Sequence, residues 1–224
     1  MKALDLKNVS FGYTQDLFPL KELGLSVDRG EHIAVLGESG TGKSSLLRII
    51  AGLEKVASGE VFIDGELVSS CTHHRPPEKR KVGMVFQDWA VFPHLSVTEN
   101  IGFGLTCRGK SQNGMERVER LLNAFELNEF ALRAPHTLSG GQLQRVACAR
   151  ALAPSPRILL LDEAFSSLDL GLRQRVRAQV FEALRSEGVT VLMVTHDPSE
   201  AFECAERVFE LKEGSLIQLT RQSP

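Results

Sequence analysis

The sequence has no strong excess of charge of either sign. Its 26 lysine and arginine residues nearly balance its 28 aspartate and glutamate residues, and the net charge is −2. Proteins that bind nucleic acids usually present a strongly basic face, so this balance does not favour that class of partner. It is compatible with a local basic patch. The basic run Arg75–Lys81 lies in a polar stretch, and we expect it to be a solvent-facing part of a surface loop.

Long apolar runs are also missing. The N-terminal residues Met1–Asp5 contain no apolar core of a signal peptide. No uninterrupted apolar stretch approaches the roughly 18–20 residues that a membrane-spanning helix needs. We therefore expect a soluble protein that takes part in membrane processes only through a partner.

Cysteine is scarce, and the residues that occur are far apart in the sequence. No Cys-x-x-Cys pair and no spacing typical of metal ligands is found among the four, which are Cys71, Cys107, Cys148 and Cys204. Reduced thiols in a cytosolic protein are the expected state. The adjacent His73 and His74 are a weak basis for a metal site, and we interpret them as solvated loop residues.

The sequence does contain a phosphate-binding pattern. Residues Gly37–Ser44 read Gly-x-x-x-x-Gly-Lys-Ser. The mostly apolar run His32–Leu36 before it suits a buried strand, and apolar residues at helical spacing follow it up to Gly52, which can end the helix. A glycine-rich turn without a ligand is the alternative, but the strand before the loop and the helix after it favour a phosphate-binding loop.

A loop of this kind binds a nucleoside triphosphate through its backbone. Glycines let the N–H groups approach the phosphates closely, and the N-terminus of the following helix adds the positive end of its dipole. We expect Lys43 to reach the β- and γ-phosphates and the Ser44 hydroxyl to hold Mg²⁺.

Polar residues that suit hydrolysis follow two later strands. The run Arg157–Glu163 reads as a buried strand that ends in two carboxylates. Asp162 is placed to bind Mg²⁺ through water, and Glu163 is placed to orient and polarise the attacking water. His196 follows the strand Val189–Val194, at the end where open parallel sheets bind ligands. It is a candidate sensor of the γ-phosphate, and a purely structural histidine is the alternative.

Two further features lie outside the phosphate loop. Ser139–Gly141 precede the helical stretch Leu143–Leu152, so their N–H groups and the serine hydroxyl predict a second anion-binding helix end. Tyr13, the only tyrosine, lies ahead of the phosphate loop. Its ring suits stacking on adenine, and a half-buried strand residue is an equally good interpretation.

The coarse pattern places these residues in an α/β frame. Leu4–Ser10 reads as an edge strand, Leu23–Val27 as the next strand, and a hairpin around Glu213–Gly214 closes the chain. From about Trp89 to Pro135, helical patterns replace strand patterns and indicate an inserted helical subdomain. One apolar stripe in this region consists of Met115, Val118, Leu121, Leu122 and Phe125.

Together these residues resemble the nucleotide-binding subunit of ATP-binding-cassette (ABC) transporters. The resemblance covers nearly the whole chain, in the family's order and spacing. A signature sequence followed by an Asp-Glu pair and a histidine is far more specific than the phosphate loop alone. The matching segments are Walker A at Gly37–Ser44, the Q-loop at Gln87, the signature Leu138–Gln142, Walker B through Asp162–Glu163, the D-loop Ser167–Asp169 and the switch histidine His196.

The resemblance implies a role for each of these residues. Lys43, Gln87, Glu163 and His196 would act in catalysis, Asp169 would belong to the D-loop, and the metal would be held by Ser44, Gln87 and Asp162. The nucleotide-binding residues implied are Tyr13, Gly37, Glu38, Ser39, Gly40, Thr41, Gly42, Lys43, Ser44 and Ser45. The signature residues, which would act on the ATP of a second subunit, are Leu138, Ser139, Gly140, Gly141 and Gln142.

The fold implied by the resemblance is α/β. It consists of a P-loop nucleotidase core, with a mainly parallel sheet and helices on both faces, an N-terminal antiparallel β-subdomain and an inserted helical subdomain. We expect residues 1–224 to form a single ABC ATPase domain. The core and its β-subdomain would occupy residues 1–87 and 138–224, and the helical subdomain about 88–137.

The resemblance also implies partners. Two chains would form a head-to-tail dimer, expected to be a homodimer, with two ATP molecules and Mg²⁺ between Walker A of one chain and the signature of the other. Closure on ATP and opening after hydrolysis would drive transmembrane permease subunits. The ATPase would then be a peripheral subunit at the cytoplasmic face of the cell membrane. An extracytoplasmic solute-binding protein can complete such a system, and no nucleic acid is implied.

The segments Gly83–Asp88 and Phe92–Val97 resemble bacterial importer ATPases. The importer ATPases that these segments resemble most serve the transport of ferric iron, sulfate, polyamines or sugars. We expect ferric iron as the transported solute, with polyamine or sulfate as the second choice. Trp89 and Phe92 would lie near the groove that receives a coupling helix of the membrane subunit, or else in ordinary core packing. Many of these importers continue with a C-terminal regulatory domain. The sequence ends at Pro224, so regulation by such a domain is not expected.

Other functions are weighed beside this one. A soluble ABC ATPase of DNA repair carries a long coiled coil before the signature, and the segment between Ser44 and Leu138 is too short for it. Translation-type relatives usually carry two cassettes, whereas this chain has one. An exporter or lipoprotein-release ATPase is a further alternative. A non-catalytic nucleotide-binding module tends to lose the acid or the histidine, and this chain has both.

Overall fold

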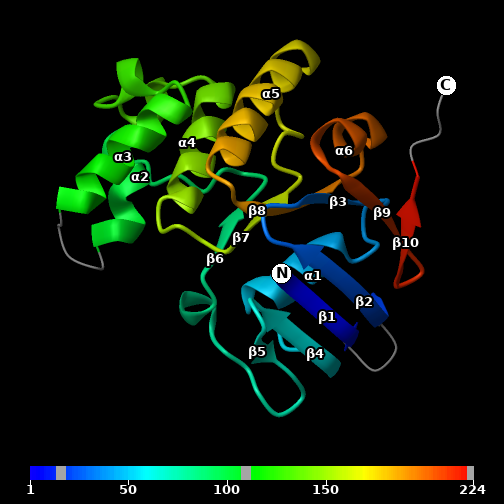
Figure 1. Ribbon diagram of the computed structural model, residues 1–224. Coiled ribbons are helices and arrows are strands. Elements are labelled where there is room, and N and C mark those ends of the chain that lie inside the picture. The colour runs from blue at the N-terminus through cyan, green and yellow to red at the C-terminus, as the bar shows by residue number, and fades with distance from the viewer. Residues whose placement is uncertain (14–18, 107–111, 221–224) are drawn as a thin grey trace. The chain divides into compact units, whose positions relative to one another are not determined.

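The computed structural model describes residues 1–13, 19–106 and 112–220 (Figure 1). Cys107 therefore lies outside the described residues. The chain divides into two compact units. The first unit contains Met1–Met84, Arg157–Asp162 and Val189–Pro224, and the second contains Val85–Pro156 and Glu163–Gly188. The second unit includes the predicted helical subdomain together with later helices, and the predicted domain boundaries stay a prediction.

The N-terminal part of the first unit is an antiparallel sheet with the strand order β2-β1-β4-β5 (Figure 1). β1 pairs with β2 on one side and with β4 on the other. The prediction of an edge strand at Leu4–Ser10 was therefore wrong. Alternation of apolar residues shows that one face of a strand is buried, but it does not show how many neighbours the strand has. The strands are β1 Lys2–Phe11, β2 Leu20–Asp28, β4 Ser58–Ile63 and β5 Glu66–Ser69.

The second sheet is mainly parallel. Its order is β10-β9-β3-β8-β7-β6. β3 runs parallel to β8 and β9, β7 runs parallel to β8, and β10 forms the predicted closing hairpin with β9. This arrangement confirms the predicted α/β class. The strands are β3 His32–Leu36, β6 Val82–Val85, β7 Ile158–Asp162, β8 Thr190–Thr195, β9 Arg207–Lys212 and β10 Ser215–Leu219.

Helix α1, Lys43–Ala51, joins the two sheets through one hydrophobic core. Its buried leucines and isoleucines pack in the same cluster as the inner faces of β1, β2 and β4 and alternate residues of β3, β7 and β8. The remaining residues of β3 and β8 are buried as well, and helix α6, Pro198–Cys204, packs near β3. Strands buried on both faces read as continuous apolar runs, which is why His32–Leu36 and Val189–Val194 gave such clear signals.

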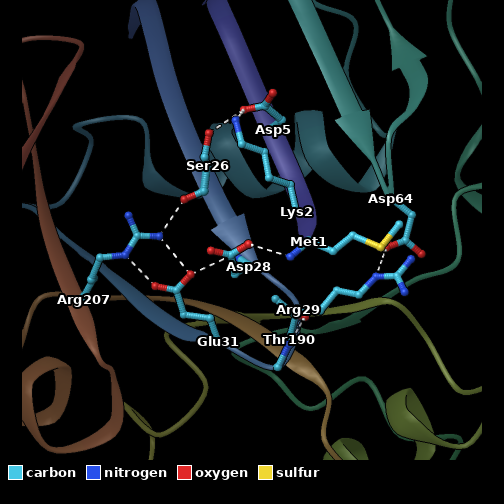
Figure 2. A network of polar contacts seen from close by, with 11 residues as sticks. Met1, Lys2, Asp5, Ser26, Asp28, Arg29, Glu31, Asp64, Thr190 and Arg207 are labelled. Carbon is cyan, nitrogen blue, oxygen red and sulfur yellow. Dashed lines mark hydrogen bonds and ion pairs between the residues drawn. The ribbon is translucent and has the colours of Figure 1, made fainter.

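A polar network ties the two sheets together at the end of β2 (Figure 2). The Arg207 guanidinium of β9 donates to the Glu31 carboxylate at 2.5 and 2.9 Å and to the Ser26 carbonyl at 2.6 Å. The hydrogen bonds to Glu31 raise the pKa of Arg207 above its usual value. The N-terminal amine of Met1 pairs with Asp28 at 3.2 Å. The bidentate contact between Arg207 and Glu31 fixes β9 against the turn that leads into β3.

The second unit is helical. Its helices are α2 Val97–Thr106, α3 Gln112–Ala124, α4 Gly140–Leu152 and α5 Leu170–Ser186. Arg117 of α3 joins three of them, because it pairs with Glu187 after α5 and donates to the Leu152 carbonyl at the end of α4. Four residues of the predicted apolar stripe are buried, but Met115 is 70% exposed. Met115 lies near the start of α3, and a spacing pattern does not reveal which part of an apolar stripe other elements cover.

The basic run Arg75–Lys81 is not uniformly solvated, because Arg80 is buried at 2% exposure. Its guanidinium donates to the carbonyls of Ile49 at 2.7 Å and Ile50 at 3.2 Å, at the C-terminus of α1, and to the Arg75 carbonyl at 2.6 Å. Burial lowers the pKa of Arg80 to about 10, so it stays charged at neutral pH. The prediction of a solvent-facing run was wrong for this residue, because two of its carbonyl partners, Ile49 and Ile50, belong to a helix distant in sequence.

No helix within the described residues is long and apolar enough to cross a membrane.

Replacement of Arg80 by alanine should destabilise the protein. The variant leaves carbonyls at the end of α1 without their charged donor, and we expect a loss of about 2–3 kcal/mol in the free energy of unfolding, measured by urea denaturation. Arg29→Ala is the control, because Arg29 forms a half-exposed pair with Asp64 and should cost at most about 1 kcal/mol. Equal losses in the two variants would contradict the assigned role of Arg80.

Gly141→Ala should loosen the packing of α4 on α5. A Cβ at Gly141 would lie 2.7 Å from Cγ2 of Val176, a buried β-branched residue of α5. We expect a loss of about 1–3 kcal/mol in thermal or urea unfolding. Gly171→Ala is the matched control, since its Cβ would meet only Asp169 Oδ1 at 3.8 Å, and a helical Gly-to-Ala change is neutral or stabilising by up to about 1 kcal/mol. A stable Gly141→Ala protein would show that the two helices are not tightly packed there.

Candidate nucleotide-binding site

Three neighbouring strands of the first unit have their carboxyl ends at the same edge of the sheet. β3, β8 and β7 are adjacent and parallel, with Leu36 opposite Thr195 and Val194 opposite Asp162. The phosphate loop follows β3, and His196 follows β8, so both leave the sheet at the edge where Asp162 ends β7. This is the edge at which open α/β sheets bind their ligands.

The phosphate loop is folded around the side chain of Lys43, which is only 4% exposed. The Lys43 ammonium donates to the carbonyls of Gly37 at 2.8 Å and Glu38 at 2.9 Å, and the Thr41 hydroxyl donates to the Glu38 carbonyl at 2.9 Å. A Cβ at Gly37 would lie 2.7 Å from Thr41 Oγ1, so this curve requires glycine. The exposed residues of the loop are Glu38, Ser39, Gly40 and Ser44.

The N-terminus of α1 has no side-chain cap. Its N-cap residue, Gly42, has a left-handed φ of 105°. A Cβ there would lie 2.9 Å from Pro19 Cβ, so both the backbone and the available space require glycine. N–H groups in the first turn of a helix have no intrahelical partner, and without a capping side chain they are a ready site for an anion.

Ser44 and Asp162 place two oxygen atoms that could bind a metal at this helix end. The Ser44 hydroxyl donates to Asp162 Oδ1 at 3.0 Å. Hydroxyl and carboxylate oxygens suit Mg²⁺, which proteins usually bind through one or two side chains together with substrate phosphates. In the part of the chain that the structure describes, no group of three or more His, Cys, Asp and Glu side chains could hold a metal by itself. The Ser44–Asp162 pair could supply two oxygen ligands to a Mg²⁺ ion.

Tyr13 lies next to the start of α1. Its hydroxyl shares a 2.8 Å hydrogen bond with Ser45 Oγ, and its ring packs edge-on against Phe11 with centroids 4.8 Å apart. Half of the residue, 50%, is exposed. A ring that is anchored at its hydroxyl and open on a face offers a surface for an aromatic base.

The turn that carries His196 is held by hydrogen bonds of the side chains on either side of it. His196 is exposed. The hydroxyl of Thr195 before it donates to the buried Glu200 carboxylate and accepts the N–H of Asp197 at 3.1 Å. Asp197 in turn caps α6 by accepting the N–H of Ser199 at 2.9 Å. These contacts fix the backbone on both sides of the histidine.

Glu163 lies in a strained turn of the second unit. Its φ of 45° is left-handed, which is uncommon for a residue other than glycine. The Glu163 carbonyl accepts hydrogen bonds from the N–H and the hydroxyl of Ser166, at 3.1 and 2.8 Å. Arg173 of α5 holds the same turn by donating to the carbonyls of Ser166 and Leu168 at 3.0 and 2.8 Å, and Asp169 caps α5. Such strain clusters at functional sites.

The signature residues begin helix α4. Ser139 is its N-cap, and Gln142 completes a capping box. The N–H of Gln142 donates to Ser139 Oγ at 3.4 Å, and the N–H of Ser139 donates to Gln142 Oε1 at 2.8 Å. A hydroxyl that accepts one hydrogen bond can still donate its own proton, so the exposed Ser139 side chain suits an approaching anion. Gly140 and Gly141 follow without side chains that would block this approach.

The site residues are divided between the two units. The first unit holds Tyr13, Gly37–Ser45, Asp162 and His196, and the second holds Gln87, Leu138–Gln142, Glu163 and Asp169. Gln87 is exposed, shortly after β6.

Sequence reasoning missed the residues that support this site: Glu200, Ser166 and Arg173. Among the contacts that support the site, only the capping box of Ser139 and Gln142 has a sequence signal, which is the Ser-x-x-Gln spacing. The other supporting contacts arise only after folding.

Comparison with known proteins agrees with this geometry. Residues 20–166 match the family described as ABC transporter. The chain is 44% identical over 218 residues to the spermidine/putrescine import ATP-binding protein PotA of Roseobacter denitrificans, covering 97% of this chain and 59% of that protein. It is also 44% identical to the Fe(3+) ions import ATP-binding protein FbpC of Pseudomonas fluorescens, covering 97% of this chain and 61% of that protein. The chain thus spans about three fifths of the length of these relatives.

A solved structure shows the same fold. The ATP-binding cassette MJ0796, described as a dimer in a post-hydrolysis state bound to ADP and Pi, superposes with a TM-score of 0.80 at 32% identity. The superposition covers 98% of this chain and 99% of that one. A family match over most of the chain, relatives at this identity and a shared fold lead to one conclusion: the chain belongs to the ABC transporter family, among its ATP-binding cassettes.

Proposed function

We propose that this chain hydrolyses ATP and thereby energises an ABC importer as its nucleotide-binding subunit. One observation carries the proposal: the uncapped N-terminus of α1, the Lys43-centred loop and the Ser44–Asp162 pair lie together at the carboxyl edge of the parallel sheet. A triphosphate requires N–H donors, a cation and oxygen ligands for its metal, and this edge supplies each of them.

Binding would use groups that are already arranged. The N–H groups of the loop and of the first turn of α1 would receive the phosphates, and Lys43 would add its charge at the β- and γ-phosphates. Ser44 and Asp162 would hold Mg²⁺, which neutralises charge on the phosphates when bound, and the resemblance adds Gln87 to this set. Tyr13 would stack on adenine.

Hydrolysis would use two side chains, Glu163 in the turn after β7 and His196 in the turn after β8. The Glu163 carboxylate would orient a water molecule and accept its proton while the water oxygen bonds to the γ-phosphorus. The bond between the γ-phosphorus and the bridging oxygen then breaks, which releases phosphate and ADP. His196 would donate to the γ-phosphate, and its fixed turn keeps that donor in one place.

The remaining half of the site would come from a second chain. Ser139, Gly140 and Gly141 belong to the second unit and would form an anion-binding turn, and the MJ0796 cassette is described as a dimer. We propose that the signature turn of one chain covers the ATP held by the phosphate loop of the other. Asp169 of the D-loop would lie at the same junction.

The two import relatives guide the choice of partners. Both are named as import ATP-binding proteins, so permease subunits at the cytoplasmic face of the membrane are the proposed partners, with a solute-binding protein in the complete system. One is named for spermidine and putrescine and the other for Fe(3+), at equal identity to this chain. The similarity therefore gives ferric iron no preference over polyamines, and the proposal stops at solute import.

Glu163→Gln should abolish turnover while ATP still binds. The amide cannot accept the proton of the attacking water, so we expect phosphate release to fall roughly 10²–10⁴-fold and an ATP-bound dimer to accumulate, as seen by size-exclusion chromatography. Glu182→Gln, on the exposed surface of α5, is the control and should hydrolyse ATP like the unmodified chain. Normal phosphate release from Glu163→Gln would remove Glu163 from the mechanism.

Tyr13→Ala should weaken binding of ATP by about 2–10-fold, because the ring no longer stacks on the base. Tyr13→Phe loses only the hydrogen bond to Ser45 and should bind ATP nearly as well as the unmodified chain. Inorganic triphosphate, which has no base, should bind all three proteins equally in calorimetric titrations with Mg²⁺. If Tyr13→Ala weakens triphosphate and ATP alike, Tyr13 supports the loop and does not stack on adenine.

A further inference from the structure

Trp89 and Ala90, in the second unit just after Gln87, have a strained backbone. Their φ angles are 59° and 47°, both in the left-handed region, and a bulky residue such as tryptophan rarely adopts it. The structure around such residues must hold them in place. Backbone strain of this kind is concentrated at functional sites.

Arg150 of α4 holds the strained segment. Its guanidinium donates to the Ala90 carbonyl at 2.6 Å and to the Trp89 carbonyl at 3.2 Å. The same guanidinium lies over the Phe92 ring, 5.1 Å from its centroid. A charged, forked donor that meets two successive carbonyls and a ring fixes the segment on α4.

The indole ring of Trp89 lies beside the N-terminus of the same helix. A Cβ built at Gly140 would lie 3.5 and 3.6 Å from Cη2 and Cζ2 of Trp89, and 3.1 Å from Cδ2 of Leu168. The indole edge is therefore a close neighbour of the residue after Ser139. The indole N–H is buried and finds no acceptor among the described residues, so the contact depends on ring packing and not on a hydrogen bond.

We propose that Trp89 is a positioning residue that sets the signature turn Ser139–Gly141 according to the position of the segment after Gln87. The backbone of Trp89 is held by the guanidinium of Arg150 from α4, and its ring lies beside the N-terminus of α4. A displacement of the segment is delivered to Gly140 through this ring, and so to the Ser139 hydroxyl. The inference deepens the proposed function and rests on it for its effect on hydrolysis.

The contact itself is tested without nucleotide, by amide hydrogen exchange of residues 138–143 in the full chain. In Trp89→Ala we expect this exchange to rise by about threefold or more, because the turn has lost its neighbour. Trp89→Phe retains a ring and removes the unpaired N–H, so its exchange should stay within about twofold of the unmodified chain. Phe130→Ala removes an aromatic ring elsewhere in the second unit and is the control. Exchange in Trp89→Ala equal to that in Phe130→Ala overturns the proposal.

The effect on the reaction is tested by steady-state hydrolysis. Trp89→Ala should lower kcat by about tenfold or more and change KM for ATP little, since the phosphate loop is untouched and only the positioning of the second half-site suffers. Arg150→Met should lower kcat in the same way, and Trp89→Phe should restore most of it. An unchanged kcat in Trp89→Ala, or an equal loss in Trp89→Phe, overturns the functional part of the proposal. An unmodified chain that hydrolyses no ATP instead overturns the proposed function, and the exchange experiment still decides whether Trp89 positions the turn.

Discussion

The structure depends on helix α1, whose N-terminus has no capping side chain and whose C-terminal carbonyls accept hydrogen bonds from a buried arginine. At the N-terminus of α1, glycine replaces a capping side chain, and the first-turn N–H groups stand ready for an anion. At its C-terminus, the buried Arg80 guanidinium binds the last carbonyls. N–H groups without a protein acceptor can bind phosphate oxygens without first breaking a hydrogen bond within the protein. The uncapped N-terminus of α1 therefore defines the proposed site. The hydrophobic core and the hydrogen bonds from Arg80 hold the helix in position.

The sequence allowed the phosphate loop to be predicted because its glycines, lysine and serine form a fixed local pattern between a strand and a helix. The strands buried on both faces were equally clear, since they are continuous apolar runs. Arg80 was misjudged because a basic residue in a polar run is usually solvated, and its partners, the carbonyls of Ile49 and Ile50, carry no sequence signal. The interior place of β1 and the strain at Trp89 likewise depend on neighbours that only the folded chain supplies.

The two helix ends that we propose bind phosphate are built differently. α1 begins with a bare glycine and a buried lysine, whereas α4 begins with the capping box of Ser139 and Gln142. The first end suits an anion that is bound tightly by many N–H groups. The second offers a hydroxyl on a helix that is already stable without ligand. In the proposed mechanism the first end loads the nucleotide, and the second is added by the partner chain under the control of the Trp89 segment.

The central claim is that each chain carries one half of two shared sites and is incomplete alone. The most direct measurement is the rate of ATP hydrolysis per chain as a function of chain concentration, with the state of association followed by light scattering. The account predicts a rate per chain that rises with concentration as dimers form and then levels off. A rate per chain that stays constant down to concentrations at which the protein is monomeric would contradict it.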